Sequence, residues 1–378
     1  MGIIYFNNAA TSFPKAPGVA EAVYQALDNL PGAANRGGIE DFDVLAAVRE
    51  NLADLAGIAQ PECIGLGSNA TWGLNVGIHG IGLTGSCKVL TTKAEHNSVL
   101  RPLYALSQTK GAQIHYLSVD RSGRVCIDDW AQALDKLQPE LCVVSHASNV
   151  TGAVNDIAAL TELAHDHGAL ILVDAAQSLG STEARFSSWG VDLVAFTGHK
   201  YLLGPQGTGG LYVRPSLELE PYLSGGTGIH SDLDTMPPTM PLRIEAGTNN
   251  DPGYHGLLAA LRWQSENPWS MAATRDLLDE LRERLLALGA MVIAPKEPCS
   301  PIVSFTLPGF SPALLGDTLL DCYDIIVRTG LHCAPRIFEC LGVDPKLRTV
   351  RVSLSRFSTE AEIDELVCAV KEIIAAGS

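Results

Sequence analysis

The chain has 378 residues, of which 46% are hydrophobic, and its 26 basic and 42 acidic side chains give a formal net charge of −16. This length predicts either one large domain with an appendage or two domains, each with its own core. The acidic balance argues against nucleic acid or an anionic membrane surface as the main partner, because both require a basic surface. We therefore expect a small-molecule ligand.

The N-terminus and the cysteines indicate a cytoplasmic protein. No stretch approaches the ~20 apolar residues of a membrane span. The opening residues MGIIYFNNAATS lack the charged start and long apolar run of a signal peptide. The nine cysteines are an odd number without a CxxC pair, unlike a secreted disulfide framework. We expect them to be thiols in a reducing compartment.

Short apolar runs alternate with amphipathic stretches through much of the chain. The runs that predict buried strands cover residues 87–92, 112–119, 141–147, 169–176, 191–198 and 209–214. Helical patterns lie between several of them, as at residues 128–137 and 157–167. This alternation predicts an α/β domain whose mainly parallel sheet is covered by helices on both faces.

The pattern changes in the remainder of the chain. Residues 221–241 are rich in Gly, Pro and polar residues, which predicts a long functional loop. Beyond it, residues 274–289 have the stripe of an amphipathic helix, and a final helix begins at a capping-box pattern of Thr359 and Glu362. With the apolar runs at 301–307 and 349–355, these elements predict a smaller α+β domain.

These patterns divide the chain into three parts. We expect residues 1–20 to form an N-terminal segment that packs near the active site and the small domain. Residues 21–255 are expected to form the large, ligand-binding domain, and residues 256–378 the small C-terminal domain.

Polar residues stand at the ends of several predicted strands, where open α/β sheets bind their ligands. Asp174 ends one strand, Asn149 follows another, and Lys200 follows a third within FTGHKYLLGPQGTGG. Singly, each has an ordinary reading, because Asp and Asn often cap helices and Lys usually points into water. Together they fit pyridoxal phosphate, which forms a Schiff base with a buried lysine and needs an acidic partner for its ring nitrogen.

A second stretch fits the phosphate of such a cofactor. In GLGSNATWGLN, residues 65–75, a Gly- and Ser-rich turn leads into a predicted helix at Ala70 and Thr71. Free backbone N–H groups at a helix start, together with a hydroxyl, bind anions. Ordinary helix starts look similar, so this turn alone does not identify a phosphate site.

Nine motifs in order along the chain carry a resemblance to a known family. They are YFNNAATSFPK, SNATWGLN, AEHNSVL, SHASNVTGAV, VDAAQS, FTGHKYLLGPQGTG, RIEAGTNN, VRTGLHCAP and RVSLSRFST. With them the chain resembles the class V aminotransferases, which are fold-type-I pyridoxal phosphate enzymes, and within that family the cysteine desulfurases of the second, selenocysteine-lyase-like group. The resemblance implies a large domain with a mainly parallel sheet and a smaller C-terminal α+β domain.

The resemblance implies roles for a set of cofactor-binding residues. Lys200 would form the Schiff base, Asp174 would pair with the pyridine nitrogen, and Gln177 would lie near the phenolic oxygen. His96 would stack on the ring and act in catalysis, and Asn149 would touch the ring oxygen or the substrate. The residues that would hold the phosphate are Ala70, Thr71, Thr197, His199 and, from a neighbouring subunit, Thr248, which implies a homodimer.

It also implies a substrate site. Arg351 would clamp the substrate carboxylate, for which a bidentate guanidinium is well shaped. Asn149, Arg328 and Ala10 would contribute further substrate contacts. The structural alternatives are a surface strand charge for Arg351 and a core histidine with a satisfied hydrogen bond for His96.

Cys333 is the residue that decides the type of reaction. Most free cysteines in a chain of this size are structural. Cys333, however, sits in TGLHCAP beside His332, and Arg328 precedes it by five residues, a setting that favours the reactive thiolate. By resemblance, its thiolate would attack the substrate sulfur after Lys200 has removed the α-proton.

The activity implied is pyridoxal-phosphate-dependent conversion of L-cysteine to L-alanine, with the sulfur left as a persulfide on Cys333 and often passed to an acceptor protein. Leu331, Asn7 and Asn249 depart from the usual family pattern, so L-selenocysteine stays open as a substrate. A selenocysteine lyase, or a class V aminotransferase or epimerase that needs no thiol, are the alternatives. No metal site is expected.

Overall fold

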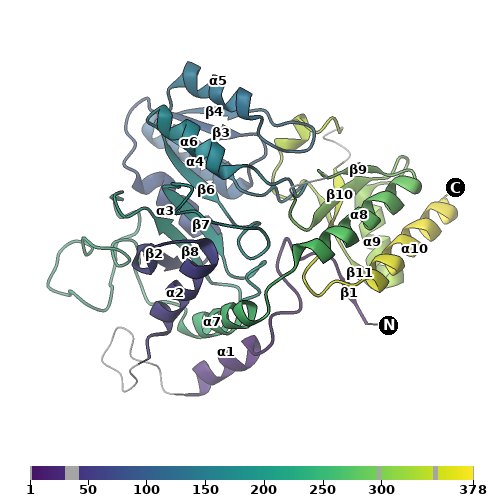
Figure 1. Cartoon of the computed structure of the whole chain (residues 1–378), viewed down its shortest axis with the longest axis horizontal. Helices are drawn as coiled ribbons and strands as arrows, with labels where there is room; N and C mark the ends of the chain where they lie inside the picture. Colours follow the sequence, from purple (N-terminus) through teal and green to yellow (C-terminus); the bar gives the residue numbers. More distant parts are fainter. Residues whose placement is uncertain (1, 30–41, 296–298, 344–347, 378) are drawn as a thin grey trace.

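Two sheets of different construction organise the chain, which is described here by a computed structural model covering residues 2–29, 42–295, 299–343 and 348–377. The larger sheet has seven strands in the order β2-β8-β7-β6-β5-β3-β4 (Figure 1). Its strands are β2 (Ile64–Gly67), β3 (Lys88–Thr92), β4 (Gln113–Leu117), β5 (Leu141–Ser145), β6 (Leu170–Asp174), β7 (Leu193–Thr197) and β8 (Gly209–Val213). All six predicted strands of this region form, each within a few residues of its expected bounds.

The larger sheet is mainly parallel, as predicted. Strands β7, β6, β5, β3 and β4 pair in parallel, and only β8 runs antiparallel to its two neighbours, β7 and β2. Strand β2 was missed because its sequence, IGLG, reads as a turn. A side chain at Gly65 or Gly67 would collide with Ile244 or Trp72, so these glycines permit close packing within a strand.

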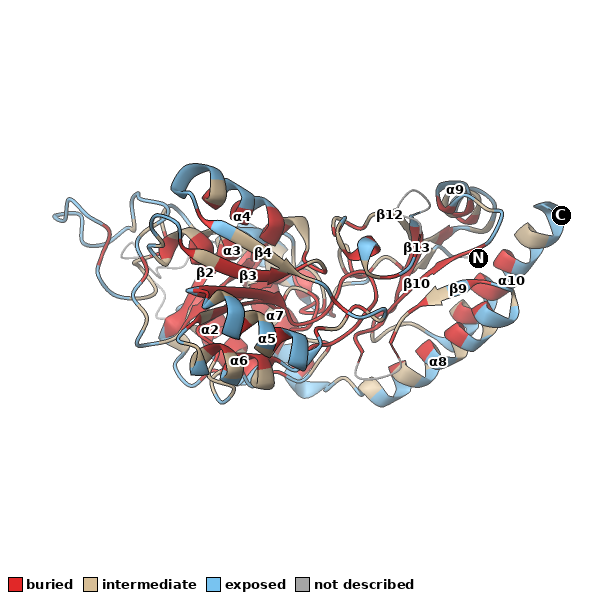
Figure 2. Cartoon of the chain, turned by 90° about the horizontal axis from the view of Figure 1, so that it is seen from above, coloured by how far each residue is buried: buried red, intermediate tan, exposed pale blue. Residues whose placement is uncertain are grey.

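Alternating residues of the central strands enter two different cores. Leu141 and Val143 of β5 pack in a cluster with α3 (Ala70–Gly80) and α4 (Asn97–Lys110). Cys142 and Val144 pack in a second cluster, whose helices include α2 (Val44–Ala56), α5 (Ile127–Leu137) and α6 (Ile157–Asp166). Side chains of a strand alternate between faces, so an unbroken apolar run marks a strand buried on both sides. Figure 2 shows these strands buried beneath helices with exposed outer faces.

The smaller sheet is antiparallel, with four strands in the order β12-β13-β10-β9. These are β9 (Met291–Ile293), β10 (Ile302–Thr306), β12 (Arg328–Gly330) and β13 (Thr349–Ser353), and the helices α8 (Met271–Ala287), α9 (Pro312–Tyr323) and α10 (Glu360–Gly377) pack beside them. The predicted capping box is confirmed: Thr359 N–H donates to Glu362 Oε2 at 2.8 Å, and Glu362 N–H donates to Thr359 Oγ1 at 3.3 Å.

Helix α7 (Asp251–Glu266) and the irregular segment before it connect the large sheet to the small sheet. Helix α7 crosses the boundary expected between residues 255 and 256, and its residues Tyr254, Leu257 and Leu261 join the core of the large sheet. The helix therefore packs with the large sheet as far as Leu261, while Trp263 near its end packs against Phe357 of the C-terminal part. Residues 221–241 contain turns and bends without helix or strand, as predicted. The two short 3₁₀ helices of the described residues are η1 (Pro61–Cys63) and η2 (Ile337–Glu339).

The N-terminal segment contacts both parts of the molecule. Strand β1 (Ile4–Tyr5) pairs in parallel with β11 (Ile325–Ile326) beside the small sheet. The chain then crosses to the large part, where Gln177 Nε2 donates to the Ala9 carbonyl at 2.9 Å and α1 (Val19–Asp28) packs on α7 (Figure 1). Of the helices in the described part of the chain, none is both long and apolar enough to cross a membrane.

Candidate functional site

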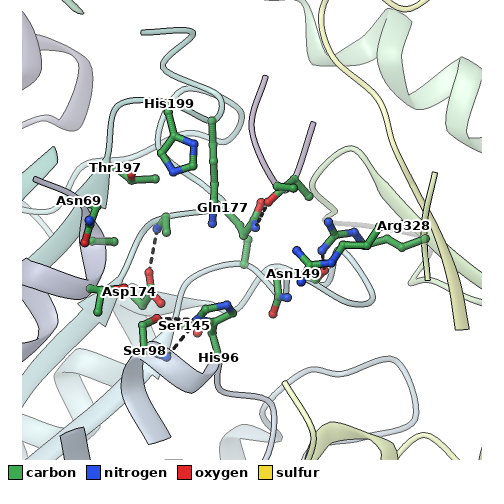
Figure 3. A pocket seen from close by; sticks show the side chains of 18 residues that line it. Asn69, His96, Ser98, Ser145, Asn149, Asp174, Gln177, Thr197, His199 and Arg328 are labelled. Atoms are coloured by element: carbon green, nitrogen blue, oxygen red, sulfur yellow. Dashed lines mark hydrogen bonds between the residues drawn. The ribbon is translucent and has the colours of Figure 1, made fainter. Parts of the chain in front are cut away.

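A cavity of about 280 Å³ lies at the carboxyl ends of β5, β6 and β7, where it also meets the small sheet (Figure 3). Its lining comes from segments that are far apart in the sequence. The lining residues are Ala9, Ala10, Asn69, Ala70, Thr71, His96, Ser98, Ser145, Ala147, Asn149, Asp174, Ala176, Gln177, Thr197, His199, Lys200, Arg328 and Arg351. Every site residue predicted from the sequence lines this cavity except Thr248 and Cys333. Thr248 is exposed and lies outside the cavity.

Asp174 and Lys200 form the charged centre of the cavity. Asp174 ends β6, and its Oδ1 accepts a hydrogen bond from the Ala176 N–H at 2.9 Å. Burial raises the pKa of the Asp174 carboxyl, while the nearby Lys200 acts in the opposite direction. Burial also lowers the pKa of Lys200 to about 8, against the opposing effect of Asp174. A fraction of Lys200 side chains therefore carries a neutral amine near neutral pH.

His96 presents a neutral imidazole to the same cavity. It caps the start of α4, where its Nδ1 accepts from the Ser98 N–H at 3.0 Å and lies 2.6 Å from the Ser98 hydroxyl. Because Nδ1 is an acceptor, the neutral ring carries its proton on Nε2. Burial, followed by the charge of Lys200, lowers the pKa of His96 to about 3. An uncharged flat ring in this position is suited to stacking on an aromatic ligand.

Arg351 reaches the cavity because successive side chains of β13 (Thr349–Ser353) point to opposite faces of the small sheet. Its neighbours Val350 and Val352 point into the core of the small domain, so Arg351 points to the opposite face. There Nη1 donates to the Asn149 carbonyl at 2.8 Å and Nη2 to Asn7 Oδ1 at 3.2 Å. The side chain is only 1% exposed, which excludes the surface strand charge considered as its alternative. Burial lowers the pKa of Arg351 to about 9.

Cys333 lines an adjoining cavity of about 370 Å³, which shares Thr71, His96 and Ser98 with the first. Arg328, which lines the first cavity, connects the two by donating from Nη2 to Cys333 Sγ at 3.2 Å. Cys333 thus stands at the border of the two cavities, with a guanidinium against its sulfur.

Hydrogen bonds hold the peptide groups on both sides of Cys333. His332 and Cys333 have φ values of 50° and 59°, in the left-handed region that non-glycine residues rarely adopt. Asn149 Nδ2 donates to the His332 carbonyl at 2.5 Å, and the Asn97 N–H donates to the Cys333 carbonyl at 2.7 Å. In this structure the amide nitrogen of Asn149 is therefore engaged by the Cys333 loop.

Several buried polar atoms that line the first cavity suit a phosphorylated aromatic ligand. Thr197 Oγ1, His199 Nδ1 and Gln177 Oε1 are buried and have no hydrogen-bond partner within the described residues. On the same side of the cavity as Thr197, α3 begins at Ala70, and the first N–H groups of a helix have no carbonyl of their own helix to bond. In the described ranges, no group of three or more His, Cys, Asp or Glu side chains is arranged to hold a metal ion.

Glu95 is a buried carboxyl beside the cavity residue His96 that the sequence did not predict. It is 0% exposed, and its carboxyl accepts from Thr92 Oγ1 and Ser145 Oγ, each at 2.6 Å. Burial raises the pKa of Glu95 to about 7, and Asp174 adds to the shift. The only sequence signal was a charged residue beside His96 in AEHNS. Asn69, also missed, was signalled by its place as the cap of α3.

The sequence matches the class-V aminotransferase family over residues 4–366. The chain belongs to this family. A relative from Xylella fastidiosa, named "Probable cysteine desulfurase", is 31% identical over 392 aligned positions, which cover 98% of this chain and 91% of the relative.

Solved structures agree with this family assignment. The apo cysteine desulfurase from Thermococcus onnurineus matches with a TM-score of 0.88 at 30% identity, covering 99% of this chain and 95% of that one. The cysteine desulfurase CsdA (S-sulfonic acid) from Escherichia coli matches with a TM-score of 0.86 at 27% identity, over 99% of this chain and 95% of that one. The predicted fold, a large domain with a mainly parallel sheet and a smaller α+β domain, is confirmed.

Proposed function

We propose that this class-V protein is a cysteine desulfurase that uses pyridoxal phosphate to convert L-cysteine to L-alanine and holds the released sulfur as a persulfide on Cys333. The family and the names of its relatives support this reaction. The observation that carries the proposal is the 3.2 Å contact between Arg328 and Cys333 Sγ at the edge of the cavity that contains Lys200. A class-V aminotransferase or epimerase needs no thiol beside that cavity.

The cavity residues would hold pyridoxal phosphate in one orientation. Lys200 would hold its aldehyde, Asp174 its ring nitrogen and His96 its ring face, while Gln177 would reach its phenolic oxygen. The phosphate would lie against the start of α3 and the residues Ala70, Thr71, Thr197 and His199. When bound, the cofactor supplies an electron sink for the negative charge that develops on the substrate α-carbon.

The remaining residues act on the substrate. Arg351 binds the L-cysteine carboxylate with its guanidinium, which requires the substrate to displace contacts now made by Asn149 or Asn7. Lys200, whose pKa burial lowers to about 8, takes the α-proton as a general base. Arg328, Asn149 and Ala10 border the same space, so they would orient the bound substrate.

Cys333 then performs the sulfur transfer. Its thiolate, held against the Arg328 guanidinium, attacks the substrate sulfur and forms the new sulfur–sulfur bond. As the carbon–sulfur bond breaks, its electron pair stays on the substrate side at the β-carbon, which takes up a proton. Lys200 returns a proton to the α-carbon, and the product leaves as L-alanine. The persulfide sulfur is afterwards passed to a thiol acceptor, for which we propose an acceptor protein.

The decisive experiment compares the wild-type holoenzyme with Cys333→Ala on L-cysteine, measuring alanine and, with dithiothreitol present, sulfide. We expect the wild type to form both products and Cys333→Ala to lose sulfur transfer while it retains cofactor colour. L-selenocysteine should remain a substrate of Cys333→Ala, because selenium leaves carbon more easily than sulfur. Cys340→Ala, which changes another partly buried cysteine, is the matched control and should behave as wild type.

Two other results would contradict the proposed reaction. A keto acid or a D-amino acid from the wild type would favour the aminotransferase or epimerase alternative. Desulfuration by Cys333→Ala at the wild-type rate would return Cys333 to the role of a structural loop cysteine.

We further propose that the enzyme is a cytoplasmic homodimer in which Thr248 reaches the phosphate of the neighbouring site. Thr248 lies outside the cavity of its own chain. The irregular 221–241 segment exposes apolar side chains that a second subunit would cover: Tyr222, Leu223, Ile229 and Leu233.

A further inference from the structure

The carbonyl oxygen of His199 is the acceptor of four donors, all from the N-terminal segment. The Ser12 N–H donates at 2.9 Å, the Ser12 and Thr11 hydroxyls at 3.1 Å each, and Lys15 Nζ at 3.0 Å. This carbonyl belongs to the peptide bond that joins His199 to Lys200. The peptide that immediately precedes Lys200 is therefore held in place by residues of the N-terminal segment, which is distant in the sequence.

Lys15 is the hub of this arrangement. Besides the His199 carbonyl, its ammonium donates to Ser12 Oγ at 3.0 Å and to Thr11 Oγ1 at 3.3 Å, so each of its three protons has an oxygen acceptor. The two hydroxyls in turn donate to the same carbonyl. Hydrogen bonds with a charged donor are the stronger kind, and linked bonds of this type reinforce one another. Removing the ammonium would leave the hydroxyls without their common donor.

The same segment is anchored at two further places around the cavity. The Ala16 N–H donates to the Leu203 carbonyl at 3.4 Å, at the far end of the turn that carries Lys200. Upstream, the Ala9 N–H donates to Ser353 Oγ at 2.9 Å, two residues from Arg351 on β13. Residues 9–16 therefore span from the small sheet to both ends of the Lys200 turn.

We propose that Lys15 is a positioning residue for Lys200: through the His199 carbonyl, its ammonium fixes the peptide from which the Lys200 side chain projects into the cavity. The proposal deepens the function proposed above, because it rests on Lys200 as the residue that reacts. Lys15 does not line the cavity and touches no reacting atom. Small misplacements of a reacting group lower rates steeply, about 100-fold for a shift of roughly 1 Å, so such an anchor has a measurable effect.

The first test uses the cofactor-free protein and does not depend on catalysis. The Leu203 and Gly204 N–H groups close the Lys200 turn on the carbonyls of Lys200 and Gly198, each at 2.9 Å. In Lys15→Met, we expect hydrogen exchange at these two amides to accelerate about 10- to 100-fold, the effect of losing a hydrogen bond from a charged donor. Lys15→Arg, which keeps a charged donor, should restore protection to within about threefold of wild type.

The matched control is Lys88→Met. Lys88 Nζ likewise donates to a backbone carbonyl, that of Leu137, at 2.9 Å, but far from this turn. The Lys88→Met variant should leave hydrogen exchange at the Leu203 and Gly204 amides unchanged. Thr11→Val removes one uncharged donor from the His199 carbonyl, so it should accelerate the same amides less than Lys15→Met does. It also serves as the test variant if Lys15→Met does not fold.

The second test measures the consequence for Lys200. With pyridoxal phosphate and cyanoborohydride, the rate of covalent attachment at Lys200 should fall about 10- to 100-fold in Lys15→Met and recover in Lys15→Arg. In the loaded enzyme, kcat should fall by a similar factor, while the KM for L-cysteine, which depends on Arg351, should stay within about threefold.

Two results would overturn the positioning role: unchanged exchange at Leu203 and Gly204 in folded Lys15→Met or Thr11→Val, or unchanged attachment at Lys200 in Lys15→Met. Absence of desulfurase activity in the wild type would refute the proposed function alone, because exchange and attachment are measured without turnover.

Discussion

Arg328 and Arg351 are register partners across the antiparallel strands β12 and β13, so two guanidinium groups project from the same face of the small sheet. Like charges placed opposite each other destabilise a sheet. Within the described residues neither forms an ion pair with a carboxylate: Arg328 contacts the Cys333 sulfur, and Arg351 contacts the oxygens of Asn149 and Asn7. Under the proposed function, the two guanidinium groups would serve two separate groups, the Cys333 sulfur at Arg328 and the substrate carboxylate at Arg351.

Replacement of Arg351 by Lys should weaken substrate binding more than turnover. A lysine keeps the charge but loses the planar pair of donors that a carboxylate accepts, so we expect the KM for L-cysteine to rise roughly 10- to 100-fold. Steady-state kinetics on alanine formation measures this split. Arg356→Lys is the control, because the Arg356 guanidinium lies over the Trp263 ring, 4.6 Å from its centroid, and outside the cavity. An unchanged KM in Arg351→Lys would remove Arg351 from the carboxylate site.

Glu95 should make the stability of the cofactor-free protein depend on pH. Burial raises the pKa of this carboxyl to about 7 from an ordinary value of 4.5, so the folded state holds the proton more tightly than the unfolded state does. Its contribution to stability is then fully present below pH 4.5 and is lost as the pH rises to about 7. The loss amounts to at most about 3 kcal/mol.

Glu95→Gln removes this titration, so its free energy of unfolding should vary less than that of the wild type across the same interval. Denaturant unfolding at a series of pH values measures the difference. Glu365→Gln, which changes an exposed carboxylate of α10, should leave the wild-type profile intact. Equal slopes for Glu95→Gln and the wild type would show that Glu95 is ionised throughout.

Lys200 should be the only lysine to which pyridoxal phosphate becomes attached. The loaded protein should be yellow, and borohydride should abolish the visible absorbance and leave the label on the peptide that contains Lys200. Lys200 lines the cavity with a pKa that burial lowers to about 8, whereas exposed lysines stay protonated and react slowly. Burial lowers the pKa of Lys15 to about 8 as well, but Lys15 lies outside the cavity and its ammonium donates to three oxygens. Peptide mapping by mass spectrometry locates the label, and a label on another lysine would contradict the assignment.

The dimer should depend on the 221–241 segment. Sedimentation of the wild type should give about twice the chain mass of 40.1 kDa. Leu233→Asp places a charge on a side chain that is 44% exposed in the single chain, and it should shift the protein toward the monomer. Leu286→Asp, at a 56% exposed position on α8, is the control and should sediment as wild type. A fully active wild-type monomer would rule out a site shared between subunits.

Much of the fold and of the candidate site could be predicted from local sequence. Fully buried strands such as 141–145 read as unbroken apolar runs, because both faces of the sheet are covered. Polar residues that end such runs, Asp174 among them, belong at the carboxyl edge of a parallel sheet, where ligands bind. The sequence could not reveal β2, since its two glycines indicate a turn until the packing of Ile244 and Trp72 against them is known.

Only the tertiary structure decided how these residues act on one another. Lys15 and the His199 carbonyl are 184 residues apart, and Asn149 and the His332 carbonyl are 183 apart, yet each pair is joined by one hydrogen bond. The register of β12 and β13, which brings Arg328 opposite Arg351, is likewise invisible in either strand alone. Periodicity and motifs report what each segment prefers locally, whereas a contact between distant segments depends on how their faces pack, which the folded chain alone determines.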